Sequence, residues 1–227
     1  MSQTLTTLIE HCIVNFEVSQ AVKLEDARWF RGAISQAMLR PEFNNHHGDK
    51  LSYVEPMIRY DTSTGRPNLV GIQNGALLLK SLPRFHKLRL GNKDVDVHRQ
   101  LVMPTRVEVG PVEDMCRYRF SSECLPLNQE NYDRWQRITQ SDKDQLIQRI
   151  LIGNLLSFAK GIGMSVTTKL EAKCKMVPVG FRVLKPGVRM LGFTGDFSVN
   201  FKLPPLWGLG KSTSRGFGTV QELEVTA

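Results

Sequence analysis

The sequence predicts an α+β protein built from two domains that meet near residue 110. The chain has 227 residues, enough for two domains of about 100 residues each, and its hydrophobic content of 41% supports folded cores. Segments with the alternation of strands and segments with helical periodicity follow one another, and the pattern restarts around Gly110-Pro111. The predicted domains are therefore 1–110 and 111–227.

The first domain contains six predicted elements. Leu8–Val18 alternates apolar and polar side chains, as expected of a half-buried strand. A helix follows, in which apolar side chains recur at helical spacing from Ala27 to Met38, until Pro41 ends the pattern. The remaining elements are strands at 51–60 and 68–72, a short helix at 74–82, and strand-like segments between 87 and 109. The order β-α-β-β-α-β is that of a ferredoxin-like domain.

The second domain begins with a strand and two helices. Asn128–Arg137 predicts a short helix. A longer helix is expected from Ser141, which has capping-box spacing with Asp144, and it carries an apolar stripe that ends at Gly161 or Gly163. The predicted strands lie at 116–124, 165–176, 180–184, 190–201 and 218–225. We therefore expect an architecture similar to that of the first domain.

The composition argues against several classes of protein. No apolar run approaches the roughly 18 residues of a membrane helix, and the N-terminus lacks the basic start and apolar stretch of a secretion signal. The four cysteines have neither C-x-x-C nor zinc spacing, which favours reduced thiols. We therefore expect a cytoplasmic protein without a membrane partner, a metal ion or another cofactor.

The distribution of charge favours a polyanionic partner. The formal net charge is +8, and nine Lys or Arg residues between Lys169 and Arg215 face only two acidic residues. A second stretch, 80–106, has seven basic residues against two aspartates. The alternative interpretation is a solvated positive face with no ligand. The basic residues of the first stretch that we expect to bind the polyanion are Lys173, Lys175 and Arg182, in addition to those described next.

The segment Gly208–Gly218 is the most informative part of the sequence. It has four glycines in eleven residues, together with two cations and several hydroxyl side chains. Glycines leave backbone N–H groups accessible to an anion, and cations and hydroxyl groups can contact phosphate oxygens. The candidate phosphate-binding residues here are Gly208, Gly210, Lys211, Ser212, Ser214, Arg215, Gly216 and Gly218.

The triplet Gly210-Lys211-Ser212 does not form a nucleotide-binding P-loop. That motif needs a glycine five positions before Gly210, where Pro205 stands. It also needs a helix and most of a parallel-sheet domain after it, and too few residues follow Lys211. The alternative to an RNA-binding segment is a structural loop in which the glycines mark turns.

Histidines lie in a polar loop after the first helix, in the sequence Asn44-Asn45-His46-His47-Gly48-Asp49-Lys50. Imidazole can abstract or donate a proton near neutral pH, Lys50 can stabilise charge on a phosphate, and Tyr53 is a further donor. RNA cleavage does not require a metal ion, because the 2′-hydroxyl is a built-in nucleophile. The alternatives to a catalytic role are that the two histidines are exposed without a function and, with less support, that they bind a metal ion.

Together these segments resemble the CRISPR-associated repeat-processing endoribonucleases of the RAMP superfamily, the Cas6 family, and most closely its b branch. The resemblance spans nearly the whole chain, and the segment 111–165 matches mainly in architecture. The segments that carry it are Phe30–Ile34, the loop 44–50, residues 53–60, Val70–Ala76, Phe197–Phe201, Leu206–Ser212 and Ser214–Gly218. The glycine-rich segment is the signature of the superfamily.

The resemblance implies two tandem ferredoxin-like (RRM-related) domains, each with an antiparallel sheet and helices on one face. It implies metal-independent cleavage of a precursor transcript within its CRISPR repeats, in which the 2′-hydroxyl attacks the adjacent phosphate and leaves 2′,3′-cyclic phosphate and 5′-hydroxyl ends. The product would serve as guide RNA. The implied partners are CRISPR repeat RNA and other subunits of a CRISPR effector complex, with the protein itself a monomer or homodimer.

The histidine loop departs from the family pattern, which reads His-Asn-His-x-Gly-Asp-Lys. Here Asn44 stands at the first histidine, His46 at the second, and His47 at the variable position. We therefore expect His46 to act as general base or acid with His47 as its helper, and Lys50 and Tyr53 to position the phosphate.

Two other functions remain open at this point. A non-catalytic RNA-binding subunit of the same superfamily would explain the charge, the fold and the glycine-rich segment equally well, but it has no need of His46 and His47 beside Lys50. A metabolic enzyme or ligand sensor on a ferredoxin-like scaffold is the third possibility, because that fold hosts many functions. The third reading predicts a small apolar pocket with convergent polar groups.

Overall fold

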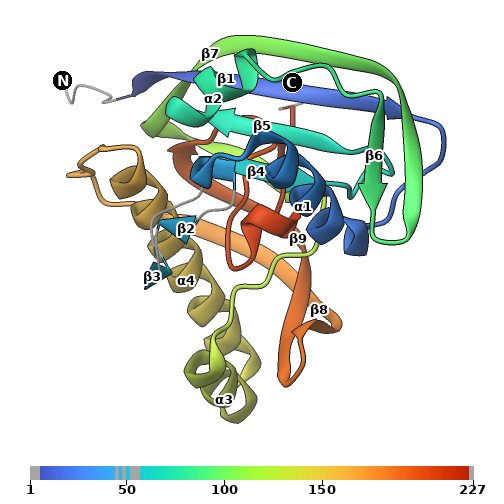
Figure 1. The fold of residues 1–227 in the computed structure, drawn as a ribbon. Helices are drawn as coiled ribbons and strands as arrows, with labels where there is room; N and C mark the ends of the chain where they lie inside the picture. Colours follow the sequence, from blue (N-terminus) through green and yellow to red (C-terminus); the bar gives the residue numbers. More distant parts are fainter. Residues whose placement is uncertain (1–5, 44–45, 48–49, 52–56, 225–227) are drawn as a thin grey trace. The chain divides into compact units, whose positions relative to one another are not determined.

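The computed structural model (Figure 1) describes residues 6–43, 46–47, 50–51 and 57–224. These residues form two compact units. The N-terminal unit comprises residues 8–107 together with 213–216. The C-terminal unit comprises residues 108–212 and 217–224, with residues 6–7 at the start of the described chain. Part of the glycine-rich segment thus belongs to the N-terminal unit.

The N-terminal unit is built on an antiparallel sheet. Its strands are β1 (Thr7–Val18), β4 (Ile58–Asp61), β5 (Asn68–Ile72), β6 (Lys87–Leu90) and the first part of β7 (Lys93–Phe120). β5 pairs antiparallel with β1 and with β4, and β7 is the other neighbour of β1, so the order is β4-β5-β1-β7. β6 pairs antiparallel with β7. A separate short ladder joins β2 (His46–His47) to β3 (Lys50–Leu51).

Two helices cover one face of this sheet. α1 (Ala27–Met38) follows the 3-10 turn η1 (Leu24–Asp26) and precedes η2 (Pro41–Phe43), and α2 (Asn74–Lys80) follows β5. Side chains from both helices lie in one buried cluster with alternate residues of β1, namely Phe30, Ile34, Ala76, Leu79, Cys12, Val14 and Phe16. Because alternate strand residues share a face, both helices pack on the same side of the sheet (Figure 1).

The C-terminal unit has a second antiparallel sheet. Its strands are β8 (Ala172–Lys185), β9 (Val188–Lys202), β10 (Val220–Glu222) and the second part of β7, in the order β8-β9-β7-β10. The helices are α3 (Gln129–Arg137) and α4 (Gln140–Gly161), and α4 packs against β8. Phe158 of α4 is fully buried, and its ring meets that of Phe201 at a centroid distance of 6.2 Å.

The residues between β9 and β10 contain no α-helix. The described chain from 203 to 219 has only the 3-10 turn η3 (Thr213–Arg215) as regular structure. The glycine-rich segment therefore occupies the place in the order of elements where the N-terminal unit has α2.

Most of the predicted elements are confirmed. The strands at 8–18, 68–72 and 190–201 and the helices at 27–38, 74–82 and 128–137 agree with β1, β5, β9, α1, α2 and α3 to within two residues at most ends. Of the predicted strand 51–60, residues 52–56 lie outside the described chain, and β4 begins at Ile58. The final strand is shorter than predicted, because β10 ends at Glu222.

Three local predictions need correction. β7 continues through Gly110-Pro111, and the interruption in its pattern is a register shift between Pro111 and Cys116, because a bulge bends a strand without ending it. The predicted strands 165–176 and 180–184 are one strand, β8, which begins at Ala172 and is also bulged. The N-cap of α4 is Thr139, not the predicted Ser141. The backbone of Thr139 is extended, as an N-cap residue requires, and its hydroxyl accepts the Asp142 N–H.

Several global features of the described residues complete the picture. No helix among them is long and apolar enough to cross a membrane, and no group of three or more metal-ligand side chains occurs in that part of the chain. The four cysteines are free thiols. Burial raises the pKa of Cys174 to about 11 and also raises the pKa of Cys12, Cys116 and Cys124.

Candidate nucleic-acid interface

The glycine-rich segment is closed at its base by backbone hydrogen bonds. The Leu209 N–H donates to the Gly218 carbonyl at 2.9 Å. The N–H groups of Lys211 and Gly218 donate to the carbonyls of Leu125 and Glu123 at 3.0 and 2.8 Å. Both ends of the segment are therefore fixed to the chain that follows β7, and the residues between them form a loop.

Glycine is required at particular positions of this loop. Gly218 has φ +68°, and a Cβ there would lie 1.9 Å from the Leu209 carbonyl oxygen. Gly210 and Gly216 have φ +100° and +82°. The N–H groups of Gly216 and Gly218 both donate within the protein, Gly216 to Thr213 at 3.2 Å. This corrects the expectation that these two glycines offer N–H groups to an anion, because the fold already uses them.

Residues 213–216 are held by the N-terminal unit, where η3 packs on β4 and α1. Arg59 of β4 is completely buried, and its Nε donates to the Thr213 carbonyl at 3.1 Å. A buried guanidinium needs acceptors in place of water, so this contact fixes η3 on the strand. The half-buried side chain of Arg215 is thereby carried on a rigid support.

Two arginines come together beside η3. The half-buried Arg31 of α1 has a pKa below its usual value, first because burial removes water, and also because the positive charge of Arg215 lies close by, an effect that Tyr60 partly opposes. Two cations held near each other favour the binding of an anion such as phosphate. Sequence reasoning missed Arg31 and Arg59 as site residues, although each is a charged residue inside an apolar, regularly patterned segment.

The start of the histidine loop is fixed to the same two elements. The carbonyl of buried Phe43 accepts hydrogen bonds from Ser35 Oγ of α1 at 2.8 Å and from Tyr60 Oη of β4 at 2.9 Å. Arg31 and Ser35 are one helical turn apart, about 6 Å along the axis. Phe43, the last described residue before the histidine loop, is therefore held by the two elements that also hold η3.

The predicted catalytic residues are described only in part. The backbones of His46 and His47 pair antiparallel with those of Leu51 and Lys50, and His47 is opposite Lys50. The side chains of His46, His47 and Lys50 lie outside the described part of the structure, as does the whole of Tyr53. The ladder brings His47 and Lys50 to neighbouring backbone positions, and their catalytic role stays a prediction.

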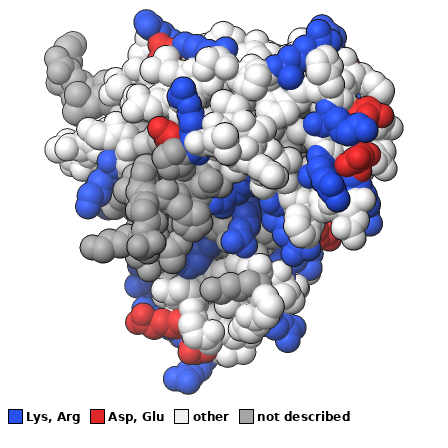
Figure 2. Space-filling model, viewed as in Figure 1, with Lys and Arg blue, Asp and Glu red and all other residues white. Residues whose placement is uncertain are grey.

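The other predicted RNA-binding residues lie in the C-terminal unit. Lys173 and Lys175 are exposed on β8, and Lys211 is exposed on the glycine-rich loop. Arg182 of β8 instead donates two hydrogen bonds to the carboxylate of Glu123, so a protein partner already compensates its charge. Figure 2 shows that Lys and Arg are more prominent than Asp and Glu on one face of the molecule.

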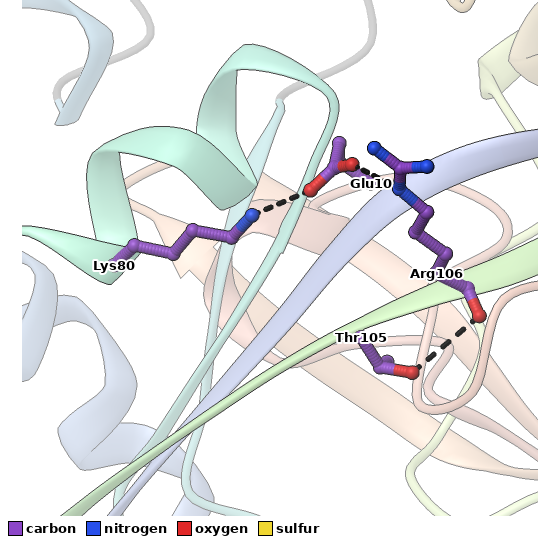
Figure 3. Close-up of polar contacts among 4 residues, drawn as sticks. All are labelled: Glu10, Lys80, Thr105 and Arg106. Atoms are coloured by element: carbon purple, nitrogen blue, oxygen red, sulfur yellow. Dashed lines mark hydrogen bonds and ion pairs between the residues drawn. The ribbon is translucent and has the colours of Figure 1, made fainter.

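Four of the seven basic residues in the second stretch, 80–106, form ion pairs with carboxylates. Glu10 of β1 accepts from Lys80 of α2 and, at 2.6 Å, from Arg106 of β7 (Figure 3). These hydrogen bonds, that from Lys80 foremost, lower the pKa of Glu10. Further ion pairs at 3.9 Å join Lys87 to Asp94 and Asp96, and Arg99 to Glu17. For these four residues the ion pairs support a solvated face more than an RNA-binding surface.

Comparisons with known proteins match nearly all of the described chain. The family model for the Cas6b N-terminal domain matches residues 7–107, and that for the Cas6b C-terminal domain matches residues 110–223. An uncharacterized protein of Methanocaldococcus jannaschii, MJ0978, is 37% identical over 117 residues, which are 52% of this chain and 79% of that protein.

Solved structures agree in fold with this chain over almost all of its length. A crystal structure of Cas6b has a TM-score of 0.86 and 26% identity, and it covers 96% of this chain and 100% of its own. A crystal structure of a CRISPR RNA processing endoribonuclease, Cas6b, has a TM-score of 0.73 and 25% identity with the same coverage. The chain thus belongs to the Cas6b family and is homologous to CRISPR RNA processing endoribonucleases.

Proposed function

We propose that this protein cleaves CRISPR precursor RNA within each repeat, without a metal ion, and so produces guide RNA. The observation that carries the proposal is the arrangement in the N-terminal unit. The histidine loop begins at Phe43 on α1 and β4, and the same two elements hold η3 with Arg215 beside Arg31. A proton-transfer group and a phosphate-binding group are thereby carried by one rigid scaffold.

The proposed reaction is an internal phosphoryl transfer. One imidazole, that of His46, accepts the proton of the 2′-hydroxyl as its oxygen attacks the adjacent phosphorus. The bond from phosphorus to the 5′-oxygen breaks, and that oxygen receives a proton from an acid, for which His47 is the candidate. The products are a 2′,3′-cyclic phosphate and a 5′-hydroxyl. Lys50 and Tyr53 position the phosphate, and the nearby arginines stabilise its negative charge.

RNA is bound, in this proposal, through phosphate contacts along the basic residues of both units. Lys211, Ser212, Ser214 and Arg215 supply side chains from the glycine-rich loop, while its glycines, including Gly208, shape the backbone. Lys173 and Lys175 extend the basic surface along β8, and Arg182 contributes only if RNA displaces Glu123. RNA of this kind is read through phosphates, stacked bases and base edges.

We also propose that the two units are tandem ferredoxin-like (RRM-related) domains that divide near residue 110. The sheet orders β4-β5-β1-β7 and β8-β9-β7-β10, and the family matches on either side of residues 108–109, support this division. The protein would act in the cytoplasm as a monomer or homodimer and would pass its product to other CRISPR effector subunits.

One observation favours a rival function. Asn44 stands where the b-branch loop has its first histidine, so the protein could bind repeat RNA without cutting it. The two functions differ in a single measurable property, cleavage of bound RNA.

The test is cleavage of repeat RNA from the protein's own CRISPR array in excess EDTA, beside a strand with 2′-deoxyribose at the cut site. We expect one cut, abolished by the deoxy substitution and by His46→Ala or His47→Ala. His98→Ala is the matched control, because His98 is exposed on β7, away from the histidine loop in sequence. Tight binding without a cut would support the rival. If the protein neither binds nor cleaves the RNA, both functions are refuted.

A further inference from the structure

A pocket in the C-terminal unit lies outside the residues assigned to cleavage. It has a volume of about 580 Å³, within the range of roughly 300–1,000 Å³ typical of small-molecule sites. Three segments line it: the start of α3, the β8–β9 hairpin and the glycine-rich loop. The lining residues are Leu127, Asn128, Gln129, Tyr132, Phe181, Gly187–Leu191 and Lys211.

The bulge in β8 turns an aromatic side chain into this pocket. The register shifts between Pro178 and Gly180, and after the shift Phe181 pairs with Leu191. Cross-strand partners point to the same face, and Leu191 belongs to the buried cluster under the helices, so Phe181 points towards α3. There its ring meets Tyr132 edge to face, at 5.7 Å between centroids.

Phe181 is nevertheless 40% exposed. The guanidinium of Arg189 lies 4.9 Å from its ring centroid. An exposed aromatic ring beside a guanidinium is the combination on which single-stranded bases stack. The pocket therefore offers a flat apolar surface together with a cation.

The charge of the pocket points to an anionic occupant. Arg189 and Lys211 are both exposed cations, and no acidic residue is among the lining residues. Within the described chain, neither cation forms an ion pair, in contrast to Arg182, Lys80 and Arg106. A purely apolar peptide or lipid would leave these cations without an anionic partner, whereas a nucleotide offers both a base and a phosphate.

We infer that this pocket binds one unpaired nucleotide of the RNA, with its base stacked on Phe181 and its phosphate held by Arg189 and Lys211. The inference rests on the proposed function, because it takes the bound polymer to be repeat RNA. It adds a specificity site in the C-terminal unit that none of the cleavage residues provides. Gln129, at the start of α3, also lines the pocket; its Nε2 donates to Asp133 Oδ1 at 2.9 Å, so its carbonyl oxygen is the group that can accept from the edge of the base.

The test combines protein variants with abasic substitutions in fluorescein-labelled repeat RNA that carries deoxyribose at the cut site. Affinity is measured by fluorescence polarisation at fixed salt. We expect Phe181→Ala to weaken binding by roughly 10- to 100-fold and Phe181→Trp to retain it, because stacking requires only an aromatic face. At one position of the repeat, an abasic substitution should weaken binding to the native protein and leave binding to Phe181→Ala unchanged.

Val177→Ala is the matched control, since Val177 is 57% exposed on the same strand before the bulge and should not alter affinity. The pocket assignment is wrong, and the proposed function stands, if native protein binds the RNA and Phe181→Ala binds equally well. The same conclusion follows if no abasic substitution in the repeat loses its effect in Phe181→Ala. If native protein does not bind repeat RNA at all, both fail. Circular dichroism of each variant shows whether a loss of affinity reflects a loss of fold.

Discussion

At Gly218 the backbone has φ +68° and passes so close to Leu209 that no side chain fits between them. The same segment contains Ser212 at φ +57°, a left-handed backbone conformation that residues other than glycine rarely adopt. The loop therefore holds its shape through individual residues, each of which satisfies a geometric requirement of the backbone. If the loop binds RNA as proposed, the placement of its side chains depends on this geometry.

We expect Gly218→Ala to lower the free energy of unfolding by about 2 kcal/mol or more, because its Cβ would force the loop backbone apart. RNA binding should weaken in parallel. Gly153→Ala is the matched control: Gly153 is exposed in α4, a Cβ there meets nothing within 4 Å, and alanine's helix propensity should raise the same quantity by about 0.5–1 kcal/mol. Urea unfolding followed by circular dichroism measures both, and equal effects would contradict the assignment.

Elements of the N-terminal unit are joined by charge as well as by the core. Glu10 connects β1 to α2 through Lys80 and to β7 through Arg106 (Figure 3). Exposed ion pairs contribute little individually, and a carboxylate shared by two cations is the more favourable geometry. The lowered pKa of Glu10 reports that the ionised form is preferred in the folded state.

The pH dependence of stability follows from the lowered pKa of Glu10 in the folded state. The contribution of Glu10 is fully present above its ordinary pKa of 4.5 and is lost as pH falls through the lower pKa of the folded state. We expect Glu10→Gln to lower the free energy of unfolding at pH 7 and to have a smaller effect as the medium becomes more acidic. Urea titrations over pH 3–7 measure this difference. Glu113→Gln, at an exposed position of β7, should show no such trend, and a trend of equal size would refute the account.

For the whole molecule, the net charge of +8 is less informative than its distribution. Lys80, Lys87, Arg99 and Arg106 all have carboxylate partners, whereas Lys211 has none within the described residues. Phosphate binding releases counterions only where a cation contacts RNA, so the two groups should differ in the salt dependence of binding.

We expect Lys211→Gln to weaken binding to every RNA sequence and to reduce the slope of log affinity against log salt by about 0.7–0.9. Lys87→Gln, the control, should leave the slope unchanged because Lys87 pairs with Asp94 and Asp96. Fluorescence polarisation between about 50 and 200 mM salt measures both slopes. An unchanged slope for Lys211→Gln would show that the loop does not contact phosphate.

Much of the fold follows from local sequence patterns. Alternation in β1 and helical spacing in α1 are properties of a few neighbouring residues, and they predict these elements within one or two residues. The strand end expected before Gly110 and the two strands expected in place of β8 were wrong for one reason, although the domain boundary proposed near residue 110 does not depend on that strand end. A bulge interrupts the alternation of side chains while the backbone ladder continues, and only the partner strand reveals that.

The sequence by itself determined the family, the glycine-rich segment and the position of the histidine loop, because these are contiguous motifs. Tertiary structure alone decided that Arg59 supports Thr213 and that Arg31 lies beside Arg215. It also decided that Arg182 pairs with Glu123 and that the Phe181 side chain points into a pocket beside Arg189. Each of these depends on residues far apart in the chain, on a register shift or on burial. The sequence shows that an arginine is charged, but the packing of the fold decides whether water, a carboxylate or another arginine surrounds it.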